Sequence, residues 1–181
     1  MLINFNKINS IIPLLKIQFS FLNFCIYLKS TTLLNVFKII KYHFKYQFKI
    51  LTCVIGIDYL EKKNRFTVIY EVLSIKFNNR LKLKIVVNEI VAIHSIKNVY
   101  IGSVWWEDEI YDMFGVLFLK RKNLIRLLTD YGFTGFPLRK DFPLSGFIDT
   151  KYHLTKNKVL YYNLELTQNY RTFIFSSPWG L

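Results

Sequence analysis

The segment from Leu127 to Phe147 constrains the fold of this chain more than any other part of its sequence. It reads LLTDYGFTGFPLRKDFPLSGF and places three glycines and two prolines among aromatic side chains. Such a segment cannot continue a helix, and it cannot form a central strand. It is also too aromatic for a solvated linker. We therefore predict an extended, backbone-constrained segment whose aromatic side chains pack against another surface and whose charges need partners.

Length and composition favour one folded domain. The chain has 181 residues, of which 52% are hydrophobic, so it is long enough for one domain with a core. The formal charge is +13, and residues 1–50 carry seven lysines with no Asp or Glu. A basic chain could bind nucleic acid, anionic lipid or acidic proteins. Because no basic cluster has the spacing of a nucleic-acid motif, we predict no nucleic-acid partner.

The first part of the chain offers one helix with two interpretations. Residues 33–51 alternate lysines and apolar side chains at helical spacing, which predicts an amphipathic helix. Such a helix could lie on an anionic membrane surface, or it could pack on its own domain or on a partner. Residues 1–32 before it are predicted to be a divergent N-terminal extension. Their longest uncharged run, Ile17 to Leu28, has 12 residues, whereas a spanning helix needs about 20. We expect no transmembrane segment.

The middle of the chain predicts strands followed by a helix. The segments 65–73 and 81–87 are rich in β-branched residues or alternate, and Asn78-Asn79 between them favours a turn, so an antiparallel hairpin is predicted over 66–88. Residues 55–60 and 93–100 are candidates for further strands. Trp105 to Gly115 predicts a short helix that ends at the glycine. A second short helix is expected over 123–128, and the tail after Phe147 is expected to be extended.

Four carboxylates in the predicted 105–115 helix are candidates for chemistry. Three consecutive acids would fall in the first helical turn, where the helix dipole favours anions. A basic protein with this cluster could be a metal-dependent nuclease. We favour ion pairs of Glu107, Glu109 or Asp112 with basic residues such as Arg139, or with a partner chain. The four carboxylates are Glu107, Asp108, Glu109 and Asp112.

No cofactor-binding signature is present in the sequence. It has no P-loop, no dinucleotide-binding glycine motif and no nucleophile elbow. The two cysteines, Cys25 and Cys53, cannot supply the four thiolates that usually hold an iron–sulfur cluster. We therefore expect this chain to bind no cofactor itself.

Three motifs resemble those of a known family. Trp106 to Gly115, and the runs Leu128 to Phe133 and Arg139 to Gly146, are similar to the thirty-kilodalton subunit of respiratory complex I, also called NADH dehydrogenase subunit 9. The last two runs match letter for letter. Asp108 stands where the family usually has Arg, Arg121 where it usually has His, and Ile125 replaces the first of two arginines. The resemblance extends more loosely from about residue 54 to the Ser-Pro-Trp ending.

The resemblance implies a core structural subunit in the peripheral arm of NADH:ubiquinone oxidoreductase, without catalytic activity of its own. It implies a position on the matrix side of the mitochondrial inner membrane, next to the forty-nine-kilodalton subunit and the subunit that carries the terminal iron–sulfur cluster. NADH, FMN, iron–sulfur clusters and ubiquinone would bind to neighbouring subunits. The complex would transfer electrons from NADH to ubiquinone and couple this transfer to proton translocation.

The predicted fold is α+β, a small mainly antiparallel sheet with flanking helices, followed by an extended C-terminal segment. The predicted divisions are 1–32, an α+β domain over 33–126, and a partner-contacting tail over 127–181. We expect the unusual Asp108 to have no cationic partner within its own chain. The candidate subunit-interface residues are Glu107, Glu109, Asp112, Asp130, Arg139, Lys140 and Asp141.

Overall fold

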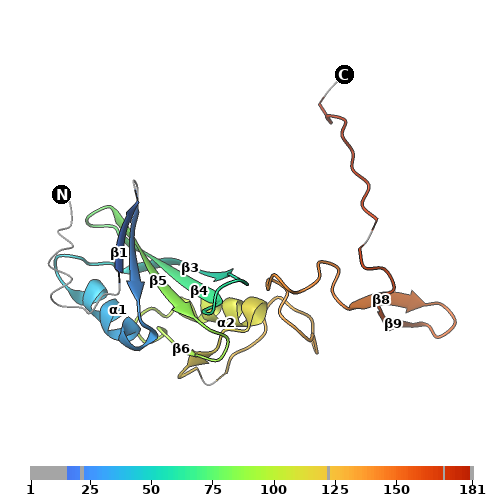
Figure 1. Ribbon diagram of the computed structural model, residues 1–181, viewed down its shortest axis with the longest axis horizontal. Helices are drawn as coiled ribbons and strands as arrows, with labels where there is room; N and C mark the ends of the chain where they lie inside the picture. The colour runs from blue at the N-terminus through green and yellow to red at the C-terminus, as the bar shows by residue number, and fades with distance from the viewer. Residues whose placement is uncertain (1–15, 21–22, 122, 169, 180–181) are drawn as a thin grey trace. The chain divides into compact units, whose positions relative to one another are not determined.

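A computed structural model of the chain describes residues 16–20, 23–121, 123–168 and 170–179 (Figure 1). The chain divides into two compact units, Met1–Lys140 and Asp141–Leu181. The first unit contains β1 (Lys16–Ser20), β2 (Asn23–Leu28), the 3-10 turn η2 (Ser30–Thr32), α1 (Leu33–Tyr42), β3 (Ile50–Asp58), β4 (Phe66–Ser74), β5 (Asn79–Val87), β6 (Ile93–His94), α2 (Ser103–Phe114) and β7 (Phe118–Leu119). The second unit contains β8 (Ile148–His153) and β9 (Lys158–Asn163).

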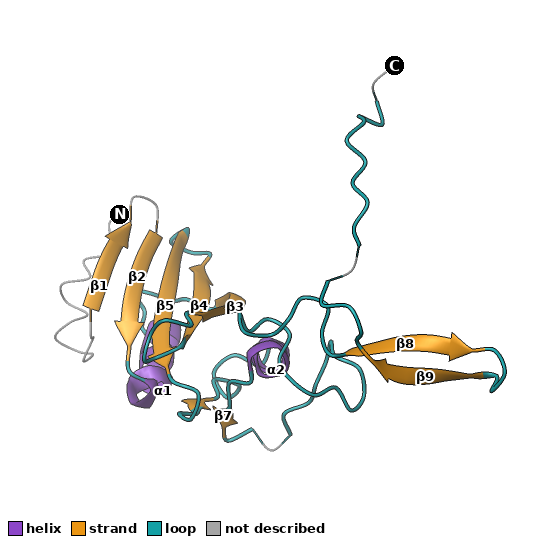
Figure 2. Cartoon of the chain, turned by 45° about the vertical axis from the view of Figure 1, so that its right-hand side comes forward, coloured by secondary structure: helices purple, strands orange, loops and turns teal. Residues whose placement is uncertain are grey.

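The first unit is built on a five-stranded sheet with the strand order β1-β2-β5-β4-β3 (Figure 2). The predicted 66–88 hairpin is confirmed as the antiparallel pair β4–β5. Asn78 in its turn has a φ of 47°, the left-handed conformation that Asn tolerates. Three of the four strand pairs are antiparallel, and β2 pairs with β5 in parallel. Helices flank this sheet, so the predicted α+β class is confirmed.

Residues 23–32 belong to the folded domain, whereas the sequence prediction began that domain at residue 33. Ile26 and Leu28 of β2 are only 1% and 2% exposed. Their register places them beside Leu83 and Ile85 of β5. Residues 1–15 of the predicted extension lie outside the described part of the chain. The prediction missed β2 because it sought local periodicity, and β2 is held by pairing with a strand more than fifty positions later.

Helix α1 covers the core face of the sheet. Its buried residues are Leu33, Val36, Phe37 and Ile40, and the Phe37 ring meets the Tyr70 ring of β4 edge-on at a centroid distance of 5.3 Å. Burial of this apolar stripe stabilises the domain by about 25 cal/mol for each Å² removed from water. The interpretation as a helix packed on its own domain is therefore confirmed. The apolar stripe needed by the membrane-surface interpretation is already covered.

The helix predicted over 33–51 ends at Tyr42, so its second half was predicted wrongly. Phe44 and Phe48 continue the apolar period, but Phe44 is 68% exposed and Phe48 is 1% exposed. The backbone N–H of Phe48 donates to the carbonyl of Ile40 at 3.0 Å, and the Tyr100 hydroxyl donates to the carbonyl of Phe48 at 2.5 Å. These contacts fold residues 43–48 back as a turn before β3 begins.

The remaining predictions of secondary structure were right in part. The 105–115 helix is α2, which begins two residues earlier and ends as expected at Gly115, in the left-handed conformation. The three consecutive acids therefore lie beyond the first turn, which contains no acidic residue. No helix forms over the described residues of 123–128. The tail, predicted to be extended without clear boundaries, contains the β8–β9 hairpin. Residues 55–60 and 93–100 contribute parts of β3 and β6.

No helix in the described part of the chain is long and apolar enough to span a membrane.

Candidate functional site

Helix α2 carries three buried carboxylates, of which two share Arg121 as a cation and the third binds the loop that follows β7. Glu107, Asp108 and Asp112 are 0%, 5% and 0% exposed. A buried carboxylate is strongly unfavourable unless hydrogen bonds or a cation compensate for its lost hydration. The partners of each carboxylate therefore indicate what α2 holds in place.

Glu107 attaches α2 to the segment that follows β6. Its carboxylate accepts hydrogen bonds from the Ser95 hydroxyl at 2.6 Å and the Ile96 backbone N–H at 2.8 Å. Arg121 adds an ion pair, with Nε 3.8 Å from Oε2. Burial raises the pKa of Glu107, although these hydrogen bonds oppose that shift. This side chain was a candidate interface residue, and in the structure it is enclosed by contacts within its own chain.

Asp108 pairs with Arg121 of the same chain, so the expectation that it would have no internal cation was wrong. The Arg121 Nη2 donates to Asp108 Oδ1. The side chains are only 9% and 7% exposed, so the pair is largely shielded from water. Both positions depart from the family pattern, and the fold brings them into contact. Sequence alone could not show this, because the end of α2 and strand β7 lie between positions 108 and 121, and local propensity does not specify how these elements pack.

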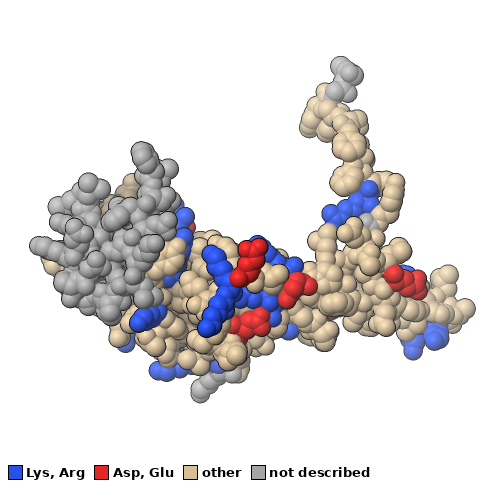
Figure 3. Space-filling view, viewed as in Figure 1, with Lys and Arg blue, Asp and Glu red and all other residues tan. Residues whose placement is uncertain are grey.

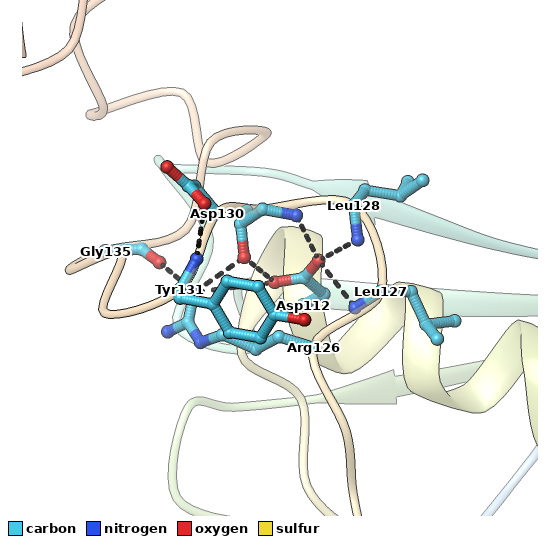
Figure 4. A network of polar contacts seen from close by, with 8 residues as sticks. Asp112, Arg126, Leu127, Leu128, Asp130, Tyr131 and Gly135 are labelled. Atoms are coloured by element: carbon cyan, nitrogen blue, oxygen red, sulfur yellow. Dashed lines mark hydrogen bonds and ion pairs between the residues drawn. The ribbon is translucent and has the colours of Figure 1, made fainter. Parts of the chain in front are cut away.

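Asp112 organises the loop that follows β7 (Figure 4). Its Oδ2 accepts hydrogen bonds from three successive backbone N–H groups, those of Leu127, Leu128 and Thr129, at 3.1, 2.8 and 3.0 Å. Its Oδ1 accepts from the Thr129 hydroxyl at 2.6 Å and lies 3.4 Å from Arg126 Nη1. Donors that would serve a helix over 123–128 are thus bound to a side chain, which explains why that predicted helix is absent.

The position of Asp112 within α2 shows that loop binding outweighs helix stability there. An anion near a helix C-terminus is disfavoured by the dipole, by about 0.3–1 kcal/mol. Burial alone would raise the pKa of this carboxyl, but hydrogen bonds from Thr129 and from the three backbone N–H groups lower the pKa below its usual value. Asp112 is therefore held as a carboxylate that fixes the loop.

The contacts of Asp112 form one anchor of the segment after β7, and a second anchor holds residues 138–140. The Leu138 N–H donates to the Met113 carbonyl at 3.2 Å, and Arg139 Nε donates to the Phe114 carbonyl at 2.7 Å. These bonds satisfy carbonyls at the end of α2 that have no partner within the helix. The Arg139 guanidinium also lies 5.1 and 4.5 Å from the ring centroids of Phe66 and Phe136. The prediction that Arg139 pairs with Glu107, Glu109 or Asp112 is wrong: among the described residues its ion pair is with Glu89, with Nη1 3.9 Å from Oε1.

Asp58 completes the second anchor, and the sequence analysis missed it. Arg65 Nε and Nη2 donate to the two Asp58 oxygens at 2.7 and 2.8 Å, and the Lys140 backbone N–H donates to Oδ2 at 2.9 Å. The hydrogen bonds from Arg65 are the main cause that lowers the pKa of Asp58. The sequence did contain a signal for this ion pair. Asp58 ends one strand and Arg65 immediately precedes the next, so a hairpin brings the two side chains together.

Gly115 permits the close approach of residues 136–139 to α2. Its φ is +78°, and a Cβ built there would lie 2.6 Å from Arg139 Nη2 and 2.7 Å from the Phe136 ring. Both the backbone conformation and the space therefore require glycine.

Residues 126–140, which we call the anchored segment, thus present a defined outer surface. Leu128, Tyr131 and Leu138 are 63%, 102% and 55% exposed. Asp130 is exposed and accepts a hydrogen bond from the Tyr131 N–H at 2.8 Å. Figure 3 shows acidic and basic side chains close together over the part of the first unit that holds α2 and β3. Large exposed side chains on a fixed backbone are typical of an interaction surface.

The other candidate interface residues differ in setting. Glu109 is partly exposed, and its side chain makes no hydrogen bond or ion pair with the described residues. Lys140 has an exposed side chain beside its bonded backbone. Asp141 is exposed and belongs to the second unit. Within the described ranges, no group of three or more His, Cys, Asp or Glu side chains could hold a metal ion.

Comparison with known proteins decides the family. The sequence model of the family described as "Respiratory-chain NADH dehydrogenase, 30 Kd subunit" matches residues 26–148. The chain belongs to this family. A protein named NADH-ubiquinone oxidoreductase subunit 9, from Reclinomonas americana, is 41% identical over 154 residues, which cover 85% of this chain and 76% of that relative. NADH dehydrogenase (ubiquinone) iron-sulfur protein 3 of Beta trigyna is 43% identical over 140 residues, or 77% of this chain and 73% of the relative.

A solved structure shares the fold of this member of the family. A chain of the membrane-bound sulfane sulfur reductase, an archaeal respiratory membrane complex, has a TM-score of 0.64 and 17% identity, covering 76% of this chain and 82% of that chain. The resemblance drawn from the 106–115, 128–133 and 139–146 motifs is confirmed. Neither the match nor the geometry of α2 supports the metal-dependent nuclease hypothesis, because Glu107 and Asp108 already bind Arg121 and Asp112 already binds the 127–129 backbone.

Proposed function

We propose that this chain is a structural, non-catalytic subunit of the peripheral arm of NADH:ubiquinone oxidoreductase. Its task is to hold the quinone-reducing module in position while electrons pass from NADH to ubiquinone and protons are translocated. Family membership supports the assignment to the complex. The observation that carries the structural role is the anchored segment, whose backbone is bound to Asp112 and Asp58 while Leu128 and Tyr131 point outward.

The proposed partners are neighbouring subunits, chiefly the forty-nine-kilodalton subunit and the subunit that carries the terminal iron–sulfur cluster. Glu109, Asp130, Lys140 and Asp141 are the charged candidates for direct contact, because their side chains are at least partly exposed. Glu107, Asp112 and Arg139 would act indirectly, by fixing the backbone that carries the contact residues. The subunit would lie on the matrix side of the mitochondrial inner membrane.

The cofactors of the reaction, NADH, FMN, iron–sulfur clusters and ubiquinone, would bind to neighbouring subunits. With two cysteines in the whole chain, a four-thiolate cluster cannot form from this subunit alone. Its contribution to catalysis is positional, since misplacement of reacting groups by about 1 Å can lower rates about a hundredfold.

The proposed contact surface can be tested with two exposed tyrosines. Tyr131 is 102% exposed on the anchored segment, and Tyr42 is 70% exposed at the end of α1. Cells would carry Tyr131→Ala or Tyr42→Ala in place of the natural subunit, and native electrophoresis with in-gel NADH oxidation would measure assembly. We expect Tyr131→Ala to reduce the active band and Tyr42→Ala to leave it unchanged. Equal assembly of both variants would contradict the role given to the anchored segment.

A further inference from the structure

The register of the β8–β9 hairpin sorts its side chains onto two chemically different faces. Directly paired residues of an antiparallel ladder share a face, and neighbours along a strand alternate. The pairs 148↔163, 150↔161 and 152↔159 therefore form one face, and 149↔162, 151↔160 and 153↔158 form the other. We call the first the uncharged face: Ile148, Thr150, Tyr152, Val159, Tyr161 and Asn163. The second is the charged face: Asp149, Lys151, His153, Lys158, Leu160 and Tyr162.

The uncharged face is largely apolar, with Thr150 and Asn163 as its uncharged polar members, and it is open to solvent. Ile148, Tyr152, Val159 and Tyr161 are 53%, 59%, 55% and 67% exposed. By contrast, the charged face has an ion pair of its own, with Lys151 Nζ 3.5 Å from Asp149 Oδ2. Figure 3 shows the second unit as mostly neither acidic nor basic on the side in view. An isolated two-stranded hairpin is marginally stable in water, and apolar contacts on one face are what such a hairpin needs.

We propose that the uncharged face of the β8–β9 hairpin docks on an apolar, uncharged surface of another protein subunit of the same complex. This inference rests on the proposed function and adds to it by naming the face and the chemistry of the partner. The absence of charge on this face determines which kind of partner surface it can bind. None of the six side chains on this face is ionisable near neutral pH, so a charged partner surface would be desolvated there without compensation.

A lipid surface fits this face less well. Peripheral membrane-binding surfaces combine apolar side chains with Lys or Arg that meet anionic headgroups. Here the basic residues Lys151 and Lys158 lie on the opposite face. The rest of the second unit agrees with a protein partner, since Ile174, Phe175 and Trp179 after the hairpin are 87%, 93% and 93% exposed. Contiguous exposed apolar side chains of this kind mark an interaction site.

Two adjacent tyrosines provide a matched test. Tyr161 lies on the uncharged face and Tyr162 on the charged face, so Tyr161→Lys and Tyr162→Lys make the same chemical change on opposite sides of one strand. Each full-length variant would replace the natural subunit, and the variant chain in the NADH-oxidising band of a native gel would be quantified by mass spectrometry. We expect Tyr161→Lys to lower incorporation at least about tenfold and Tyr162→Lys to change it less than about twofold.

The outcomes separate this inference from the proposed function. If the natural chain enters the band and both variants enter equally, or both are lost equally, the uncharged face is not the docking surface, while the proposed function stands. If the natural chain is absent from the band, both fail. Flotation of the purified full-length chain with vesicles of neutral and anionic phospholipid is the second measurement. If the natural chain binds vesicles and Tyr161→Lys abolishes that binding, the face binds lipid. If the natural chain dimerises with increasing concentration and Tyr161→Lys does not, the face binds a second copy of the chain. Either result would overturn the inference.

Discussion

Replacing Asp112 should release the anchored segment from helix α2. Asp112→Ala removes the acceptor of three backbone N–H groups and one hydroxyl, together with the ion pair to Arg126. Hydrogen bonds to a charged acceptor contribute about 1.5–3 kcal/mol each, and breaking a buried ion pair costs about 3–5 kcal/mol. The loop can open and its donors can bind water, so these terms do not add. Alanine also favours the helix by several tenths of a kcal/mol.

We therefore expect Asp112→Ala to lower the free energy of unfolding by about 3 kcal/mol. Urea unfolding of the full-length chain measures this value, and hydrogen exchange should show faster exchange at the amides of residues 127–129. Asp130→Ala is the control, because Asp130 is exposed and accepts one bond from the next residue, so its effect should stay within about 0.5 kcal/mol. If the two variants were equally stable and residues 127–129 kept their protection, the anchoring role of Asp112 would be refuted.

The same contacts support three further tests. In thermal or urea unfolding, Gly115→Ala should destabilise the chain by clearly more than the roughly 1–2 kcal/mol expected for Gly132→Ala. Both glycines have a positive φ, but of the two only Gly132 has open space for a Cβ. Equal losses of stability would mean that the close approach at Gly115 is unimportant. A double-mutant cycle with Asp108→Asn and Arg121→Gln should give a coupling free energy above about 1 kcal/mol, and additive effects would contradict the pairing. The pKa of Asp58 is lowered in the folded state, so the stability that this carboxylate contributes is present above its ordinary pKa of 3.8 and is lost as pH falls through the folded-state pKa. The difference in unfolding free energy between the natural chain and Asp58→Asn should therefore shrink from pH 6 to about pH 3. A difference that stays constant over this range would refute the assignment.

The sequence predicted those elements that depend on local patterns. Alternation with Asn78-Asn79 identified the β4–β5 hairpin, and Gly115 marked the end of α2. The glycines and prolines after Leu127 correctly excluded regular structure from most of the anchored segment. In each case the determining interactions lie within a few residues, which is the range that propensity and periodicity describe.

The elements that were mispredicted depend on contacts between distant residues. Helix α1 ends early because Phe48 is drawn back to Ile40 and Tyr100. The second predicted helix is absent because Asp112 binds the donors of residues 127–129. The carboxylates of α2 were recognised as important, but their roles were not, since a helix alone does not indicate which strand or loop each one faces. The sequence predicted direct contact of Glu107 and Asp112 with a partner, whereas the structure buries both side chains within the chain, so the role proposed for them is support of the anchored segment.

The most direct test of this account is the abundance of the chain in the respiratory enzyme itself. Solubilised mitochondrial membranes would be separated by native electrophoresis, the band that oxidises NADH would be excised, and its proteins would be quantified by mass spectrometry. We predict this chain in that band at the same molar amount as the forty-nine-kilodalton subunit. Its absence from the active band, or a small fraction of that amount, would contradict the assignment as a structural subunit of the complex.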